Sequence, residues 1–138
     1  MKLPHSRTEI QVRFSDLDIL GHVSNSYYAQ YFDLARVTFF KNISNISKSP
    51  NPSHVVASVK MDMIREIRFD NLVIVDTWCS KMGTKSMTIE HRIYANGELA
   101  TTCQTVLVGF DRDTRSSTAL PEVWEATDLS GIVAPVTP

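Results

Sequence analysis

Residues 14–36 read FSDLDILGHVSNSYYAQYFDLAR, and this stretch contains the change of pattern that decides the fold. Its first half is prone to turns, because aspartate, asparagine, serine and glycine gather there. From Asn25 to about Lys41 the apolar residues recur at spacings of four and three, which predicts one apolar helix. The side chains of Ser24, Asn25 and Ser26 are candidates for its N-cap. The positions that form the apolar stripe are Tyr28, Phe32, Ala35 and Phe39.

The segments on either side of this helix alternate between apolar and polar residues, which is the pattern of half-buried strands. Residues 8–14 precede the turn-rich loop, and four more runs follow the helix after an expected loop at 43–53. Asn96-Gly97, between the last two runs, is a strong signal for a tight hairpin. A faltering alternation at Ile64-Arg65 predicts a bulge or bend. The four later strands are expected at 54–69, 72–82, 86–95 and 98–111, followed by a short helical turn at 121–124.

This order predicts an α+β fold in which one long helix is wrapped by a curved five-stranded antiparallel sheet. A lone apolar helix needs a sheet curved enough to cover it, and the sheet's edges and outer face then invite pairing with a second copy. The 138 residues suit a single domain over 1–138, with its core at about 8–125 and a loose tail at 126–138.

The composition narrows the range of functions. Fourteen basic residues against 15 acidic ones argue against a nucleic-acid partner. No run approaches the roughly 18 apolar residues of a membrane span, and the first residues do not resemble a signal peptide, so we expect a cytoplasmic protein without a membrane partner. Cys79 and Cys103 are expected to be isolated buried thiols, and His91 a packed or surface side chain. The glycine and histidine spacings fit no phosphate loop, nucleophile elbow or metal site.

The string from the loop into the helix closely resembles the signature of the 4-hydroxybenzoyl-CoA thioesterase family, whose members have the hot-dog fold. That pattern reads roughly aromatic-x-Asp-x-Asp-x-x-Gly-His-Val-Asn-Asn, followed by Tyr, Tyr-Phe and Ala-Arg. Ser24 replaces the first Asn, and Asp70-Asn71 stands where Gly-Asp is usual. The resemblance covers about residues 9–124, and only residues 18–36 are specific. The matching positions are Phe14, Asp16, Asp18, Gly21, His22, Val23, Asn25, Tyr28, Tyr31, Phe32, Ala35 and Arg36.

The resemblance implies an acyl-CoA thioesterase that hydrolyses an acyl-thioester to a free acid and a thiol. It makes Asp18 the catalytic carboxylate, as nucleophile or general base, and the backbone amide of Asn25 the group that holds the thioester oxygen. These groups suit the chemistry, because a thiolate leaves without a strong general acid and free N–H groups at a helix start can stabilise an oxyanion. The other residues expected at the site are His22, Val23 and Tyr28.

Other residues near Asp18 are expected to have structural roles, or roles that the sequence leaves open. His22 either contacts the thioester or pantetheine region or makes a hydrogen bond within the loop. Asp16 is expected to fix the loop, and Arg36 to make a structural ion pair, for which Asp16 is a candidate partner. The cations considered for the nucleotide end of coenzyme A are Arg65, Arg68, Lys81, Lys85 and Arg92.

The family's pocket lies between protomers, so the resemblance implies a homodimer that forms the active site, and we expect a homotetramer. The substrate is an acyl-CoA or an acyl carrier protein thioester. Coenzyme A then belongs to the substrate, and no cofactor is expected. Two alternatives remain: a non-catalytic acyl-CoA-binding protein, and a hydratase or dehydratase of the same fold. The second would want a histidine on the helix, and residues 26–41 contain none.

Overall fold

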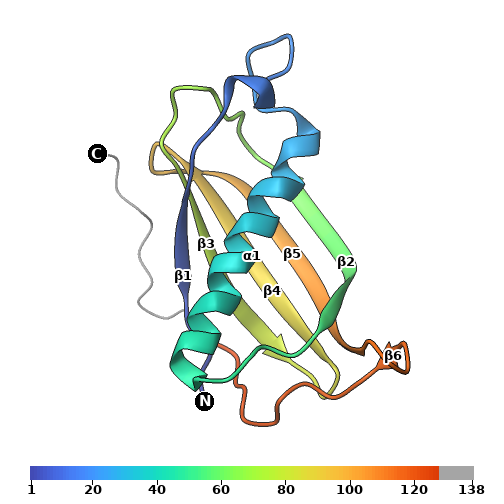
Figure 1. Cartoon of the computed structure of the whole chain (residues 1–138). Helices are drawn as coiled ribbons and strands as arrows, with labels where there is room; N and C mark the ends of the chain where they lie inside the picture. The colour runs from blue at the N-terminus through green and yellow to red at the C-terminus, as the bar shows by residue number, and fades with distance from the viewer. Residues whose placement is uncertain (128–138) are drawn as a thin grey trace.

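The computed structural model describes residues 1–127, in which one long helix, α1 (Asn25–Ser47), lies across one face of an antiparallel sheet (Figure 1). The strand order is β1-β3-β4-β5-β2, and a short strand β6 pairs with β5. The predicted arrangement of one helix and five antiparallel strands is confirmed, and β6 is an addition. The strands are β1 (Ser6–Ile10), β2 (His54–Met63), β3 (Val73–Met82), β4 (Ser86–Ala95), β5 (Glu98–Asp111) and β6 (Ser116–Ser117).

Helix α1 buries the predicted apolar stripe against the sheet, but it is longer than predicted. It runs to Ser47 instead of Lys41, because Ile43 is fully buried and continues the packed face. Lys48 then ends the helix in the left-handed conformation, with φ of 58°. The prediction of a loop over residues 43–53 is therefore wrong for its first five residues. The buried side chains of α1 are Tyr28, Tyr31, Phe32, Ala35, Phe39, Phe40 and Ile43.

Strands β4 and β5 have the predicted bounds, because the hairpin between them fixes both. Asn96 and Gly97 have φ of 50° and 79°, which is the conformation that a two-residue hairpin of this sequence requires. β4 pairs with β5 along the whole length of β4, apart from one irregularity at Ile93 and Tyr94.

Strands β1 and β2 are shorter than their apolar patterns predict, since each ends where its ladder ends. The pairing of β1 with β3 stops at Ile10, so the strand covers residues 6–10 instead of 8–14. The pairing of β2 with β5 stops at Met63 instead of residue 69. The amides of Ile64 and Arg65 both donate to the carbonyl of Ala100, at 2.8 and 3.0 Å. The predicted bend is confirmed there, as the point where the chain leaves the sheet.

The space between α1 and the sheet is filled by aromatic and aliphatic side chains, together with the buried imidazole of His91. Its Nδ1 lies 2.9 Å from the hydroxyl of Thr77, and its ring packs on Phe32. Burial lowers the pKa of His91 to about 3, so the ring is neutral at neutral pH. Cys79 and Cys103 are free and buried, as predicted.

The segment after β6 returns across the end of the sheet. The predicted turn is present, with the Trp124 amide donating to the Pro121 carbonyl at 3.2 Å. The Thr127 amide donates to the Cys79 carbonyl at 2.8 Å, so the start of the predicted loose tail is bound to β3. The rest of that tail, 128–138, lies outside the described residues. Within residues 1–127, no helix is long and apolar enough to cross a membrane.

Candidate active site

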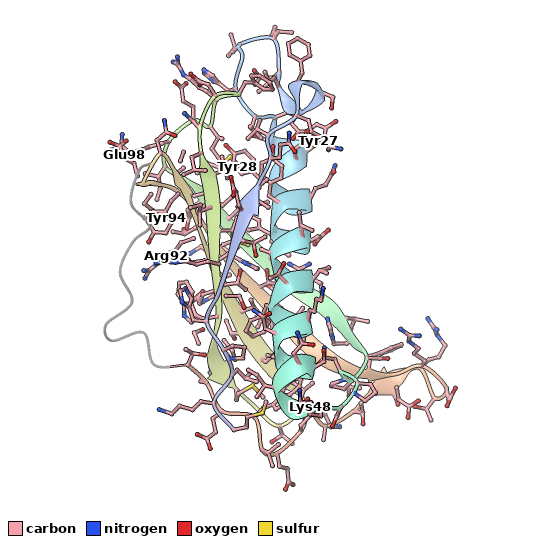
Figure 2. All side chains as sticks on the ribbon, turned by 60° about the vertical axis from the view of Figure 1, so that its left-hand side comes forward. Tyr27, Tyr28, Lys48, Arg92, Tyr94 and Glu98 are labelled. Carbon is pink, nitrogen blue, oxygen red and sulfur yellow. The ribbon has the colours of Figure 1, made fainter. Side chains whose placement is uncertain are left out.

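The five residues predicted to form the site lie together at the N-terminal end of α1. They line one shallow pocket of about 270 Å³. Figure 2 shows Tyr28 at this end of the helix and Lys48 at the other. The opposite wall of the pocket comes from the end of β2 and the bend after it. The lining residues are Asp18, His22, Val23, Asn25, Tyr28, Met63, Ile64, Arg65 and Glu66.

The Asp18 side chain stands at the start of a tight loop that its own hydrogen bonds close. Its backbone amide donates to the carbonyl of His22 at 2.8 Å, and its carbonyl accepts from the amide of Gly21, whose φ of 79° favours glycine. The carboxylate oxygen Oδ1 accepts from the amides of Leu20 and His22, at 2.9 and 3.2 Å. Residues 1–127 supply no hydrogen bond to Oδ2. One oxygen therefore fixes the carboxylate while the other is available.

Asp16 has a different environment, although it is only two positions away. Its side chain is 0% exposed and accepts hydrogen bonds from the Tyr31 hydroxyl at 2.6 Å and from the amide and Nε of Arg13, both at 3.1 Å. Burial acts to raise the pKa of Asp16, but these hydrogen bonds outweigh it and hold the pKa below its ordinary value. The loop-fixing role predicted for Asp16 is therefore observed.

The ion pair considered between Arg36 and Asp16 is not formed. Arg36 pairs instead with Asp33, one turn before it on α1, and Arg13 pairs with Asp16 at 3.0 Å. Asp16 contacts the helix at Tyr31, and a residue five positions later projects about 140° away around the helix axis. Arg36 thus has the structural role that the sequence predicts, with another partner.

The first turn of α1 lies at the pocket, which Asn25 lines. Ser24 is the N-cap residue, and α1 begins at Asn25. Among the described side chains, none caps this turn, and the Ser24 hydroxyl lies 3.4 Å from that of Ser26. Ser24 therefore occupies the N-cap position, as predicted, but its side chain makes no capping hydrogen bond. Uncapped amides at a helix start are donors for a developing negative charge, and the helix dipole favours that charge.

Val23 and Tyr28 form the buried floor of the pocket. The Val23 amide donates to the Ile67 carbonyl at 2.8 Å, which ties the loop to the opposite wall. Burial raises the pKa of Tyr28, and the charge of Asp18 adds to this effect, so the phenol remains protonated.

His22 forms a chain of polar contacts with two residues from the opposite wall. Its Nε2 lies 2.6 Å from Glu66 Oε2, and Glu66 Oε1 accepts from Arg68 Nε at 2.8 Å. These contacts match the interpretation of His22 as a hydrogen-bonding residue of the loop. Sequence reasoning missed Glu66 as a pocket residue. The one local signal was the bend predicted at Ile64-Arg65, which brings this wall to the helix.

The residues of the pocket do not form a metal cluster. Among residues 1–127, no group of three or more histidine, cysteine, aspartate or glutamate side chains is arranged to hold a metal ion. The chemistry available in the pocket is that of one fixed carboxylate, backbone amides, a phenol and a histidine–glutamate pair.

Comparisons with known proteins point to one family. Residues 12–127 match the model of the thioesterase-like superfamily. A curated relative, the uncharacterized protein YsmA of Bacillus subtilis (strain 168), is 29% identical over 83 residues, which are 60% of this chain and 56% of that protein. The chain thus aligns with little more than half the length of this relative.

Solved structures of thioesterases have the same fold. A thioesterase from Thermus thermophilus, complexed with coenzyme A and Zn, is 36% identical, with a TM-score of 0.74 over 84% of this chain and 85% of that one. A predicted thioesterase from Bacillus stearothermophilus is 26% identical, with a TM-score of 0.76 over 86% and 90%. The DHNA-CoA thioesterase from Staphylococcus aureus is also 26% identical, with a TM-score of 0.73 over 86% and 81%.

The narrower likeness to the 4-hydroxybenzoyl-CoA thioesterases stays a prediction, because the matching model describes a broader group. That model covers most of the chain, including the Asp18 loop, the whole of α1 and all of the later strands. With the fold shared across the solved thioesterases, these matches show that the chain belongs to the thioesterase-like superfamily.

Proposed function

We propose that this protein is an acyl-CoA thioesterase with Asp18 as its catalytic carboxylate. The proposal rests on one observation: Asp18 and the uncapped first turn of α1 lie at the same pocket. Membership of the superfamily supports it, as does the likeness to a Thermus thermophilus thioesterase whose structure contains coenzyme A.

Asp18 supplies the reacting oxygen in either of two ways. As a nucleophile, Oδ2 attacks the thioester carbonyl carbon, the C–S bond breaks, and water then hydrolyses the resulting anhydride to the free acid. As a general base, Oδ2 takes a proton from water, the hydroxide attacks the same carbon, and the proton passes to the departing thiolate. The hydrogen bonds to Oδ1 support both routes, because they fix the carboxylate without occupying Oδ2.

The Asn25 amide is the donor that we assign to the thioester oxygen. In both routes negative charge develops on that oxygen, and a backbone N–H at a helix start needs no reorganisation to stabilise it. Val23 and Tyr28 then bound the acyl side of the pocket. His22 holds the loop through Glu66.

A second copy of the chain, paired along β2, completes the proposed site. β2 is an edge strand with β5 as its one sheet neighbour in the described chain, and its central residues are exposed. An exposed apolar edge is a surface for strand pairing. Because β2 ends at the pocket wall, a subunit paired there would stand over the pocket and cover it. The exposed apolar side chains on and after this edge are Val55, Val56, Val59, Met63 and Ile64.

The test is a hydrolysis screen over a panel of acyl-CoAs of aromatic, short-chain and long-chain type, read as released thiol. An acyl carrier protein thioester is included as a second carrier. We expect turnover of at least one thioester, and Asp18→Asn should lower it by roughly 10²–10⁴-fold, because the amide removes the reacting oxygen. The matched control is Asp113→Asn, in the exposed turn before β6, which should keep wild-type activity.

The remaining outcomes distinguish the alternatives. Tight binding of several acyl-CoAs without turnover would replace the proposal by a non-catalytic binding protein. Addition of water to an enoyl-CoA without release of thiol would replace it by a hydratase. Near wild-type hydrolysis by Asp18→Asn would leave the thioesterase activity standing and remove Asp18 from its catalytic role.

A further inference from the structure

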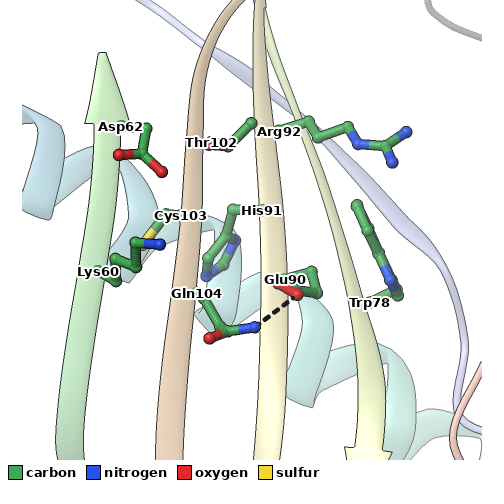
Figure 3. A pocket seen from close by; sticks show the side chains of 9 residues that line it. All are labelled: Lys60, Asp62, Trp78, Glu90, His91, Arg92, Thr102, Cys103 and Gln104. Atoms are coloured by element: carbon green, nitrogen blue, oxygen red, sulfur yellow. Dashed lines mark hydrogen bonds between the residues drawn. The ribbon is translucent and has the colours of Figure 1, made fainter.

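A carboxylate lies in each of two hollows of the structure, and each one contacts a polar side chain. On the face of the sheet opposite α1, Glu90 accepts a hydrogen bond from Gln104 Nε2 at 2.9 Å, as Figure 3 shows. At the candidate active site the carboxylate is Glu66, which pairs with His22. Asp18 lines the second hollow and not the first. Of the two carboxylates, Glu66 is therefore the one placed to influence Asp18.

His22 connects Glu66 with Asp18. Its ring nitrogen Nε2 lies 2.6 Å from Glu66 Oε2, and its backbone amide donates to Asp18 Oδ1 at 3.2 Å. Its carbonyl accepts from the Asp18 amide at 2.8 Å. One residue thus contacts Glu66 through its side chain and Asp18 through its backbone. A displacement of the His22 ring therefore also moves a group that fixes the Asp18 carboxylate.

The segment that carries Glu66 is itself fixed. Arg68 Nε donates to Glu66 Oε1 at 2.8 Å, and the backbone of Arg68 forms an antiparallel bridge with that of His22. Next to this bridge, the Val23 amide donates to the Ile67 carbonyl at 2.8 Å. The backbone contacts hold the two segments side by side, and the contact between Glu66 and His22 then sets the position of the ring.

The two contacts of Glu66 require a carboxylate. An ionised carboxylate is an acceptor at both oxygens, so it can accept from His22 Nε2 on one and from Arg68 Nε on the other. The contact also selects Nε2 as the ring nitrogen that carries a proton. A glutamine side chain has one acceptor oxygen and one NH₂ donor. At position 66 it could therefore accept from only one of the two partners.

We propose that Glu66 is a positioning residue for the hydrolysis, acting through His22 on the carboxylate of Asp18. The inference rests on the proposed function, in which Asp18 Oδ2 reacts while the Asn25 amide holds the thioester oxygen. A misplacement of about 1 Å in such a geometry costs roughly 10²-fold in rate. Arg68 balances the charge of Glu66, so the second carboxylate adds no net negative charge beside the developing oxyanion.

A positioning role changes the rate of the reaction and leaves the stability of the fold unchanged. The side chains of His22 and Glu66 are 30% and 41% exposed, and exposed ion pairs contribute little to folding. The orientation of the Asp18 carboxylate matters in the transition state and not for binding of the remaining parts of the substrate. Loss of Glu66 should therefore lower kcat and leave KM unchanged.

The test is a kinetic comparison of Glu66→Gln with the wild-type chain, on the thioester that the wild type hydrolyses fastest. We expect kcat to fall about 10–100-fold and KM to stay within about threefold, with the wild-type midpoint in urea unfolding. Two controls receive the same change. Glu90→Gln alters the carboxylate of Figure 3, and Glu98→Gln removes an ion pair of 3.3 Å with Arg65, on the same pocket wall as Glu66. Both should keep the wild-type kcat.

A double variant tests whether the effect passes through His22. His22→Ala removes the ring that Glu66 contacts and keeps the backbone amide that donates to Asp18. If Glu66 acts through the ring, adding Glu66→Gln to His22→Ala should lower kcat by less than about a further twofold. Losses that multiply in full would show that Glu66 acts by another path and would overturn the proposal.

The other outcomes separate this inference from the proposed function. Wild-type kcat in Glu66→Gln overturns the inference and leaves the thioesterase activity standing. A fall in kcat together with a lower urea midpoint makes Glu66 a structural residue, which also overturns the inference. If the wild type hydrolyses no thioester of the panel, the proposed function and the inference fall together.

Discussion

Asp16 and Asp18 belong to the same loop and the same motif, yet the fold treats them in opposite ways. Asp16 is buried and accepts hydrogen bonds from Tyr31 and Arg13, while Asp18 is exposed and accepts from two amides of its own loop. A buried carboxylate that is fully hydrogen-bonded organises the chain around it. A carboxylate with one free oxygen at a pocket is available for chemistry. The resemblance to the thioesterase family predicts different roles for the two residues, whereas the residue type, which is the same at both positions, does not.

The same substitution at both positions tests most directly whether Asp16 and Asp18 differ in their contribution to stability. We expect Asp16→Asn to lower the free energy of unfolding by about 2–4 kcal/mol, because the amide places an NH₂ donor against donors from Tyr31 or Arg13 in a buried site. Asp18→Asn should change it by no more than about 0.5 kcal/mol, since that side chain is exposed. Urea unfolding followed by circular dichroism measures both. Equal losses in the two variants would contradict the division of roles.

A smaller change tests which partner holds Asp16. Tyr31→Phe removes the hydroxyl that donates at 2.6 Å and keeps the buried ring, so we expect a loss of about 1.5–3 kcal/mol, the range for a hydrogen bond to a charged group. The matched control is Tyr27→Phe on the same helix. The Tyr27 ring lies under the Arg13 guanidinium, and this substitution should lower the free energy of unfolding by less than about 0.5 kcal/mol. If both variants unfold alike, the Tyr31 hydroxyl does not anchor the loop.

The comparison also shows which parts of the site could be predicted from the sequence. The loop and the first turn of α1 are adjacent in the chain, so a local motif places Asp18, His22, Val23, Asn25 and Tyr28 in one region, and the structure brings all five to one pocket. Glu66 comes from a different segment, more than 40 positions after His22. Its contact with His22 depends on where β2 leaves the sheet, and no local pattern encodes that.

The same difference between local signals and contacts of distant segments applies to the ends of the strands and of the helix. The bounds of β4 and β5 could be predicted because the Asn96-Gly97 turn is a local signal. The end of β1 is set by its ladder with β3, and residues 11–13 keep an alternating pattern after the ladder has stopped. The end of α1 is set by the burial of Ile43, although the residues around it are polar. Pairing and burial are tertiary properties, and the local composition gave the opposite indication.

The smallest expected effect is a difference in the pH dependence of stability between wild type and Asp16→Asn. The folded-state pKa of Asp16 lies below its ordinary value of 3.8, so the carboxylate contributes stability above that value and loses it as the pH falls through the folded-state pKa. The stability gap between the two proteins should therefore narrow as the pH is lowered from 6 toward 3.

His91 adds acid sensitivity of its own, because its pKa of about 3 in the folded protein compares with an ordinary value of 6.5. The unfolded chain binds this proton first, and stability falls as the pH drops from 6.5 toward 3. Both proteins carry His91, so its effect cancels in the gap and the narrowing isolates Asp16. Urea unfolding at half-unit steps of pH measures the gap. A gap that stays constant down to pH 3 would mean that the ionised form of Asp16 contributes nothing to the loop.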